Sequence, residues 1–261
     1  MADTDDRPSL LVVERMSKRF GGLDALTDVS LTVRRGEIFG VIGPNGAGKT
    51  TLFNVLTGLY RADSGICVLD GVSLAGAKPH RVAELGMART FQNIRLFLNM
   101  TTLENVMVGR HVRTSTGVLG ALCRLPAARA EESAIVGRAR ELLEYCGISR
   151  HANTLAKHLP YGDQRRLEIA RALATDPKLI ALDEPAAGMN ASETDTLKVL
   201  LERMRADHRT LLIIEHDVKL MLGLCDRVAV LDYGKKIAEG APAEIRQNPA
   251  VIEAYLGTGH A

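Results

Sequence analysis

A glycine-rich stretch at residues 43–50 constrains this chain more than any other feature of its sequence. It reads Gly43-Pro44-Asn45-Gly46-Ala47-Gly48-Lys49-Thr50, which fits the pattern G-x-x-x-x-G-K-[ST] at every fixed position. The residues at 37–42 are typical of a buried strand, and those at 51–59 carry apolar side chains at helical spacing. A strand, a glycine-rich turn and a helix are the context that this phosphate-binding motif requires.

The residue types of this phosphate loop suit a triphosphate. Gly43, Gly46 and Gly48 allow the backbone amides to approach the phosphate oxygens, with the positive end of the following helix behind them. Lys49 supplies a charge for the outer phosphates, and Thr50 supplies a hydroxyl ligand for Mg²⁺. The alternative, a chance glycine turn before a helix, explains the glycines but not the lysine and threonine that follow them.

A second motif, which is acidic, follows a predicted buried strand. Residues 179–182 form a continuous apolar run that suits a parallel strand buried on both faces, and Asp183 and Glu184 follow it directly. The carboxyl ends of strands in open α/β sheets are where ligands bind. Asp183 could hold Mg²⁺, and Glu184 could polarise the water that attacks the γ-phosphate. Structural acids at strand ends are common, but the phosphate loop favours a nucleotidase site.

Four further positions leave two interpretations open when each is considered alone. Phe20 could stack on an adenine or be an ordinary core or turn aromatic, and Gln92 could bind a metal-held water or be a surface residue. His216 follows the buried strand at 210–214 and could reach a γ-phosphate or be a structural histidine. The helix that follows Gly162 could offer a second anion site or be a plain helix start. Asn190, followed by Glu193, predicts a helix cap with its reciprocal acid.

Composition excludes several classes of protein. The chain has 33 basic and 31 acidic side chains, a net charge of +2, so no nucleic-acid or membrane-surface bias follows. No apolar run approaches the ~20 residues that span a bilayer, and the polar residues 1–8 are no signal peptide. The four cysteines form no Cys-x-x-Cys pair, which predicts a reduced, cytoplasmic chain; they are Cys67, Cys123, Cys146 and Cys225.

Residues from about 95 to 160 change character, because helical periodicity replaces the strand signals. Residues 114–126 are rich in Gly, Ser, Thr and Pro and predict a loop. This region is expected to be a helical insertion into an α/β core. Since the chain has one phosphate loop and one Asp-Glu strand end, it carries one nucleotide-binding half.

In this order, the motifs resemble the ATP-binding cassette of ABC transporters over nearly the whole chain. Asp183 and Glu184 fall at the family's Mg²⁺ carboxylate and catalytic glutamate, and residues 187–190 fall at its dimer-contact loop. The stretch at 159–173, from Leu159-Pro160-Tyr161-Gly162-Asp163-Gln164 onward, is similar to the family's signature and helix. Gln92 and His216 match the glutamine loop and switch histidine, and Phe20 matches the adenine-stacking aromatic, so the functional interpretation is preferred at each.

The resemblance implies ATP and Mg²⁺ as cofactors and assigns a role to each candidate residue. Catalytic roles fall to Glu184, His216, Gln92 and Lys49, and metal binding falls to Thr50, Gln92 and Asp183. The implied nucleotide-binding residues are Phe20, Gly43, Pro44, Asn45, Gly46, Ala47, Gly48, Lys49, Thr50, Thr51, Tyr161, Gly162 and Asp163.

The implied fold is α/β, a P-loop NTPase core with a mostly parallel sheet, an N-terminal antiparallel β part and a helical subdomain. The predicted divisions are residues 1–94 for the first part of the core and 95–163 for the helical subdomain with the signature at its end. Residues 164–240 complete the core, and residues 241–261 form a C-terminal helical tail.

The resemblance also implies partners, because each ATP would lie between the phosphate loop of one cassette and the signature of another. A second cassette, the same or homologous, is therefore required. Integral membrane permease subunits would hold the chain at the cytoplasmic face of the inner membrane, and the segment around 92–98 would transmit movement to them. A solute-binding protein outside would be an indirect partner, and nucleic acid is not expected.

Within the family, the chain is most similar to the G-type ATPases of branched-chain (hydrophobic) amino acid uptake systems. The shared stretches include Arg19-Phe20-Gly21-Gly22, Ala88-Arg89-Thr90-Phe91-Gln92-Asn93 and the end Ala254-Tyr255-Leu256-Gly257. Related cassettes serve amide or urea uptake and lipopolysaccharide export. A soluble cassette acting on ribosomes or DNA would carry two cassettes or a long coiled coil, and a non-catalytic nucleotide sensor would not need Glu184.

Two departures from the family pattern concern the contact with the partner cassette. Pro160 and Tyr161 stand where the signature usually has serine and glycine, and proline offers neither a hydroxyl nor an amide donor. Asn190 replaces the usual aspartate of the dimer-contact loop. The expectation is a weakened contact across the dimer with the catalytic residues intact.

Overall fold

A computed structural model of the chain describes residues 7–110, 112 and 126–256. The predicted loop at 114–126 lies outside these residues up to position 125, as do Cys123, residues 1–6 and the last five residues. Cys67, Cys146 and Cys225 are buried and free, as expected of core thiols.

The described strands form two sheets, a parallel-rich one and an antiparallel one. In the larger sheet the order is β10-β9-β3-β8-β7-β6, where only β10 runs antiparallel to its neighbour. Its strands are β10 Lys235–Gly240, β9 Arg227–Asp232, β3 Ile38–Ile42, β8 Thr210–Ile214, β7 Leu179–Asp183 and β6 Met87–Arg89. The smaller sheet, in order, has β2 Leu23–Arg34, β1 Ser9–Phe20, β4 Ser64–Leu69 and β5 Val72–Ser73.

The larger sheet is buried on both faces, and its side chains alternate between two cores. In β3, Ile38 and Ile42 face one cluster, whereas Phe39 and Val41 face the other. The first cluster packs this sheet against the helices of the middle and C-terminal parts, and the second joins it to the smaller sheet. Continuous apolar runs such as β7 and β8 are therefore explained, because both of their faces need apolar side chains.

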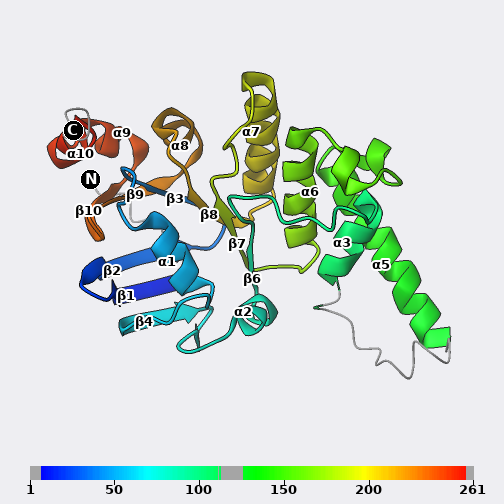
Figure 1. Ribbon diagram of the computed structural model, residues 1–261, viewed down its shortest axis with the longest axis horizontal. Helices are drawn as coiled ribbons and strands as arrows, with labels where there is room; N and C mark the ends of the chain where they lie inside the picture. Colours follow the sequence, from blue (N-terminus) through cyan, green and yellow to red (C-terminus); the bar gives the residue numbers. More distant parts are fainter. Residues whose placement is uncertain (1–6, 111, 113–125, 257–261) are drawn as a thin grey trace.

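Most of the described helices pack on the first of these two cores. Helix α1 Lys49–Leu56 contributes Leu52, Phe53 and Leu56 to the core between the sheets. Helices α3, α5 and α6 gather at the right-hand end of Figure 1, and α8, α9 and α10 lie at the other end. The remaining helices are α2 Pro79–Leu85, α3 Thr102–Arg110, α5 Pro126–Tyr145, η2 Ser149–His151, η3 Ala156–His158, α6 Tyr161–Leu173, α7 Ala191–Ala206, α8 Val218–Leu224, α9 Pro242–Gln247 and α10 Pro249–Leu256.

The predicted α/β fold with an antiparallel N-terminal part and a helical region is confirmed, with local corrections. The sequence predicts a turn over residues 17–22, but residues 17–20 instead continue β1 and pair with β2 as far as Phe20 opposite Leu23. The turn is confined to Gly21 and Gly22, where Gly21 has a φ of 57°. The sequence predicts a helix from Arg165 to Ala174, but α6 begins four residues earlier, at Tyr161, and ends at Leu173. The divisions at 94, 163 and 240 stay a prediction.

Candidate functional site

The phosphate loop connects the buried strand β3 to helix α1, as the motif requires. Its glycines adopt conformations that side chains disfavour: φ is 153° at Gly43, 82° at Gly46 and 97° at Gly48. A Cβ at Gly43 would lie 2.1 Å from the Leu231 carbonyl oxygen, and one at Gly48 would lie 2.6 Å from that of Ala25. The loop therefore needs glycine at these two positions for packing as well as for backbone freedom.

Lys49 is folded back across this loop. Its Nζ donates hydrogen bonds to the carbonyl oxygens of Gly43 at 2.6 Å and Pro44 at 2.8 Å, and the residue is only 7% exposed. Burial lowers the pKa of Lys49, and the negative charge of Glu184 acts against that shift. The ammonium group is thus held inside the loop, where it would meet an incoming phosphate.

The loop opens into a cavity of about 430 Å³, within the range of small-molecule sites. It brings together residues far apart in the sequence: Phe20 on β1, the loop residues 45–51, Gln92 and Glu184. Phe20 is 42% exposed and packs edge-to-face against Tyr60, with ring centroids 5.2 Å apart. Its ring forms part of the wall of the cavity, and Lys18 Nζ lies over the ring, 5.2 Å from its centroid.

Glu184 is the centre of a small polar cluster beside the loop. Gln92 donates from Nε2 to Glu184 Oε2 at 2.7 Å, and His216 Nδ1 lies 3.8 Å from the same oxygen. Glu184 has a φ of 46°, an uncommon conformation for a non-glycine residue and one that often marks functional sites. Two residues from two other segments therefore converge on the Glu184 carboxylate, because the parallel strands β6, β7 and β8 end at the same edge of the sheet.

Glu215, which sequence analysis left without a role, supports this cluster from below. It is 1% exposed and accepts hydrogen bonds from the backbone amides of Ala186 at 2.7 Å and His216 at 3.2 Å. Burial raises its pKa, and these hydrogen bonds act in the opposite direction. The signal for it in the sequence was a charged residue directly after a fully apolar strand. Asp217, two residues on, caps α8 by accepting from the Leu220 amide.

The oxygen donors near the loop fit a magnesium ion held jointly with phosphates. Asp183 ends β7, Thr50 lines the cavity, and the Gln92 amide donates to Glu184 through its nitrogen. Carboxylate, hydroxyl and amide oxygens are hard ligands of the kind that Mg²⁺ prefers. Among the described residues no group of three or more His, Cys, Asp and Glu side chains could hold a metal, so the protein alone offers no closed cage there.

The signature residues lie outside this cavity. Pro160 precedes α6 and provides no side-chain cap, and the Tyr161 hydroxyl donates to the Ala187 carbonyl at 2.9 Å. The Gly162 amide donates to Glu193 Oε1 at 3.2 Å. Asp163 is 4% exposed and held by Arg166 and His151, an arrangement that does not favour its predicted contact with nucleotide.

The predicted cap at Asn190 is confirmed. Asn190 Oδ1 accepts from the Glu193 amide, and Glu193 Oε2 accepts from the Asn190 amide, both at 3.0 Å. One carboxylate therefore contacts the N-termini of both α6 and α7.

A family model for ABC transporters matches residues 26–187, more than half of the chain. This chain belongs to the ABC transporter family. A second model, for branched-chain amino acid ATP-binding cassette transporters, matches residues 235–261. As a member of the family the cassette binds ATP and is an ATPase, and the predicted class of protein is confirmed.

Curated relatives match this cassette along its length. It is 49% identical to the high-affinity branched-chain amino acid transport ATP-binding protein LivG of Salmonella typhimurium, covering 95% of this chain and 98% of that one. Identity is 46% to the protein BraF of Pseudomonas aeruginosa over the same shares. It is 36% to the lipopolysaccharide export ATP-binding protein LptB of Haemophilus influenzae, again over 95% and 98%.

Solved structures agree with the fold. An ATP-binding cassette of an ABC transporter in its ADP conformation superimposes with a TM-score of 0.83 at 34% identity, covering 95% of this chain and 99% of that chain. A nucleotide-free cassette gives 0.82 at 33% identity, covering 95% and 98%. None of the described helices has the length and apolar character that crossing a membrane requires.

Proposed function

We propose that this cassette powers an ABC importer for branched-chain, hydrophobic amino acids. The observation that carries the proposal is the 49% identity to LivG of Salmonella typhimurium over 95% of the chain. The match of residues 235–261 to the model for branched-chain amino acid cassettes supports it independently of the shared nucleotide-binding core. The lower identity of 36% to the lipopolysaccharide exporter LptB makes export the second candidate.

The residues of the cavity suggest how ATP would be bound. Lys49 and the loop amides would hold the phosphates, and Phe20 would stack on the base. Thr50, Asp183 and the Gln92 oxygen would hold Mg²⁺, which supplies positive charge for the outer phosphate oxygens.

The polar cluster suggests how ATP would be hydrolysed. Glu184 would orient and polarise the attacking water, with Gln92 fixing one of its oxygens at 2.7 Å. His216, held at its backbone by Glu215, would approach the γ-phosphate from the end of β8.

A second cassette would complete the site. Tyr161, Gly162 and Asp163 are not among the residues that line the chain's own cavity, so the signature helix α6 would serve the nucleotide of a partner. The partner would be an identical or a homologous chain; in either case, closure on ATP and reopening after hydrolysis would couple chemistry to movement.

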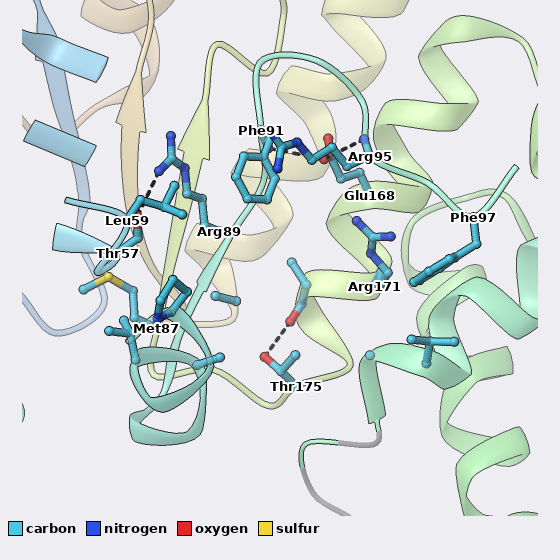
Figure 2. A pocket seen from close by; sticks show the side chains of 17 residues that line it. Thr57, Leu59, Met87, Arg89, Phe91, Arg95, Phe97, Glu168, Arg171 and Thr175 are labelled. Atoms are coloured by element: carbon cyan, nitrogen blue, oxygen red, sulfur yellow. Dashed lines mark hydrogen bonds between the residues drawn. The ribbon is translucent and has the colours of Figure 1, made fainter. Parts of the chain in front are cut away.

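A groove beside the glutamine loop is where a permease subunit would dock. Figure 2 shows this groove of about 450 Å³, whose lining includes Phe97, 47% exposed, together with Phe91 and Arg171. Its charged residues are three arginines, Arg89, Arg95 and Arg171, against one glutamate, Glu168. Burial raises the pKa of Glu168, while hydrogen bonds from the Phe91 and Arg95 amides and the charge of Arg165 act in the opposite direction. An apolar segment with an acidic side chain would fit it.

This docking would place the cassette peripherally at the cytoplasmic face of the inner membrane. The permease would in turn receive the amino acid from a solute-binding protein outside. Co-purification of the cassette with integral membrane proteins would support this arrangement, whereas a cassette recovered only on ribosomes or nucleic acid would contradict it.

The experiment that tests the proposed solute is leucine uptake in the source cells, with the gene intact, deleted, or restored as Lys49→Ala. Loss of uptake on deletion and failure of Lys49→Ala to restore it are expected. Unchanged uptake in cells where no other leucine carrier is active would contradict the amino-acid assignment, and amide, urea and lipopolysaccharide transport would then be measured in the same strains.

A further inference from the structure

Arg89 occupies an unusual position between the nucleotide cavity and the groove. It is the last residue of β6, and its guanidinium Nη2 lies 2.6 Å from Asp183 Oδ2 at the end of the neighbouring strand β7. Its Nη1 donates to Asn54 Oδ1 at 2.7 Å and Thr57 Oγ1 at 2.8 Å, both at the end of α1. One side chain thus ties the helix that follows the phosphate loop to the candidate metal carboxylate.

This ion pair is buried. The Arg89 and Asp183 side chains are 7% and 4% exposed. A buried carboxylate without a counter-charge is strongly unfavourable, so the contact with Arg89 offsets the cost of burying Asp183. The oxygen that Arg89 holds, Asp183 Oδ2, is a carboxylate oxygen of the kind that a magnesium ion would bind.

The other face of Arg89 contacts the groove. Its guanidinium lies 5.0 Å from the centre of the Phe91 ring, and Arg95 lies 4.2 Å from the same ring. Figure 2 shows Phe91 between these arginines, with Arg89 directed to Thr57 on the α1 side. Arg89 Nε is buried and has no hydrogen-bond partner among the described residues, so the guanidinium is not held at all of its donors.

We propose that Arg89 is a positioning residue that competes with the metal for the Asp183 carboxylate. In the metal-free chain Arg89 holds Asp183, and it releases the carboxylate when magnesium nucleotide binds. Because Arg89 also contacts Phe91, its release alters the groove wall and reports metal loading to the docking surface. This inference rests on the proposed metal and docking roles of Asp183 and the groove.

The absence of tryptophan from the sequence allows a clean test. In a Phe97→Trp background, the only tryptophan reports on the groove. The full chain is loaded with a non-hydrolysable ATP analogue and titrated with Mg²⁺, and both nucleotide retention and tryptophan emission are recorded. The melting temperature is measured without metal and nucleotide. The variants are Arg89→Gln, Arg89→Lys and the exposed control Arg81→Gln, whose arginine pairs only with Glu84 among the described residues.

Arg89→Gln is expected to lower the Mg²⁺ midpoint about tenfold, because the competitor for Asp183 is removed. Its melting temperature without ligands should fall by about 5 °C, since a buried carboxylate loses its partner. The Mg²⁺-dependent emission change should disappear, while the change caused by nucleotide alone remains. Arg81→Gln should behave as the parent.

An unchanged or higher Mg²⁺ midpoint in Arg89→Gln, with the folded state intact, would overturn the inference, because a purely structural arginine would change stability alone. If Arg89→Gln does not fold, Arg89→Lys is the deciding variant, and its Mg²⁺ midpoint is expected to be about threefold lower than that of the parent. A parental or higher Mg²⁺ midpoint would contradict the inference. Asp183→Asn separates a failure of the Arg89 inference from a failure of the proposed metal site. If this variant keeps the parental Mg²⁺ dependence, the proposed metal site itself is wrong.

Discussion

The two ends of the candidate ATP site differ in how complete they are within one chain. At the phosphate loop, Lys49, Gln92 and Glu184 already converge on one cavity. There Lys49 donates to a carbonyl oxygen of the loop, and Gln92 donates to Glu184. At the signature helix, Pro160 provides no cap, and the Gly162 amide is engaged by Glu193 of the same chain. In the proposed mechanism the first region would act on ATP, whereas the second would act on the nucleotide of a partner.

This difference explains why the departures from the family pattern can be tolerated. Pro160 and Tyr161 fall in the region proposed to contribute binding contacts to a partner, not in the region proposed to polarise water. Pro160 has no hydroxyl that could cap α6. The Glu193 carboxylate partly takes over this capping, because it accepts a hydrogen bond from the Gly162 amide. Substitutions in the two regions should therefore have effects of different size.

The largest effect is expected at Glu184. Glu184→Gln should lower ATP turnover of the assembled complex by ~10²–10⁴, the usual scale for a general base, while ATP affinity is retained. Turnover and equilibrium nucleotide binding, measured on the same preparation, check this. Rapid hydrolysis by the variant would remove Glu184 from the catalytic role.

Lys49→Ala should have the next largest effect, and on binding. The lost charge-assisted hydrogen bonds to phosphate correspond to an affinity for Mg-ATP lower by roughly 10- to 100-fold. Titration of the isolated chain with a fluorescent ATP analogue measures this, and Lys198→Ala at the exposed pair with Glu202 on α7 serves as control. Equal affinity for parent and variant would mean that the loop does not hold the outer phosphates.

Pro160→Ser tests the weaker region. A serine hydroxyl could cap α6 and contact the partner's γ-phosphate, so kcat/KM for ATP in the assembled complex should rise by about 2- to 10-fold. Steady-state kinetics of both complexes provide the measurement. A fall in kcat/KM would show that the proline is needed where it is.

The smallest effect is expected at Glu193. Glu193→Ala removes the capping box of α7 and the contact to Gly162, so the free energy of unfolding should fall by about 1 kcal/mol. Urea denaturation of the isolated chain measures it against Asp195→Ala, an exposed acid on the same helix. If both variants lose the same stability, the double capping by Glu193 contributes nothing.

The same contrast determines what could be predicted from the sequence. The phosphate loop, the strands at 179–182 and 210–214 and the cap at Asn190 were predictable, because each depends on local residue types or an uninterrupted apolar run. The continuation of β1 through residues 17–20 could not be predicted, since it depends on pairing with β2, and its polar residues show no strand pattern.

Long-range contacts account for the features of the site that the sequence did not reveal. The convergence of Gln92 and His216 on Glu184 depends on strands that are adjacent in the sheet but distant in the chain. The partners that hold the buried Asp163 come from α6 itself and from the short helix η2. The burial of Asp163 could therefore not be inferred from the motif. Strand β6 was overlooked because three residues are too few to show a period.

The central claim is that the complete catalytic site is shared between chains. The measurement that tests it most directly is ATP hydrolysis per cassette, compared between the isolated chain, shown to be monomeric by sedimentation, and the same chain in its purified membrane complex. A rate at least about tenfold higher in the complex is expected, since the partner's contacts stabilise the transition state by more than about 1.4 kcal/mol. A monomeric chain that hydrolyses ATP as fast as the complex would contradict the account.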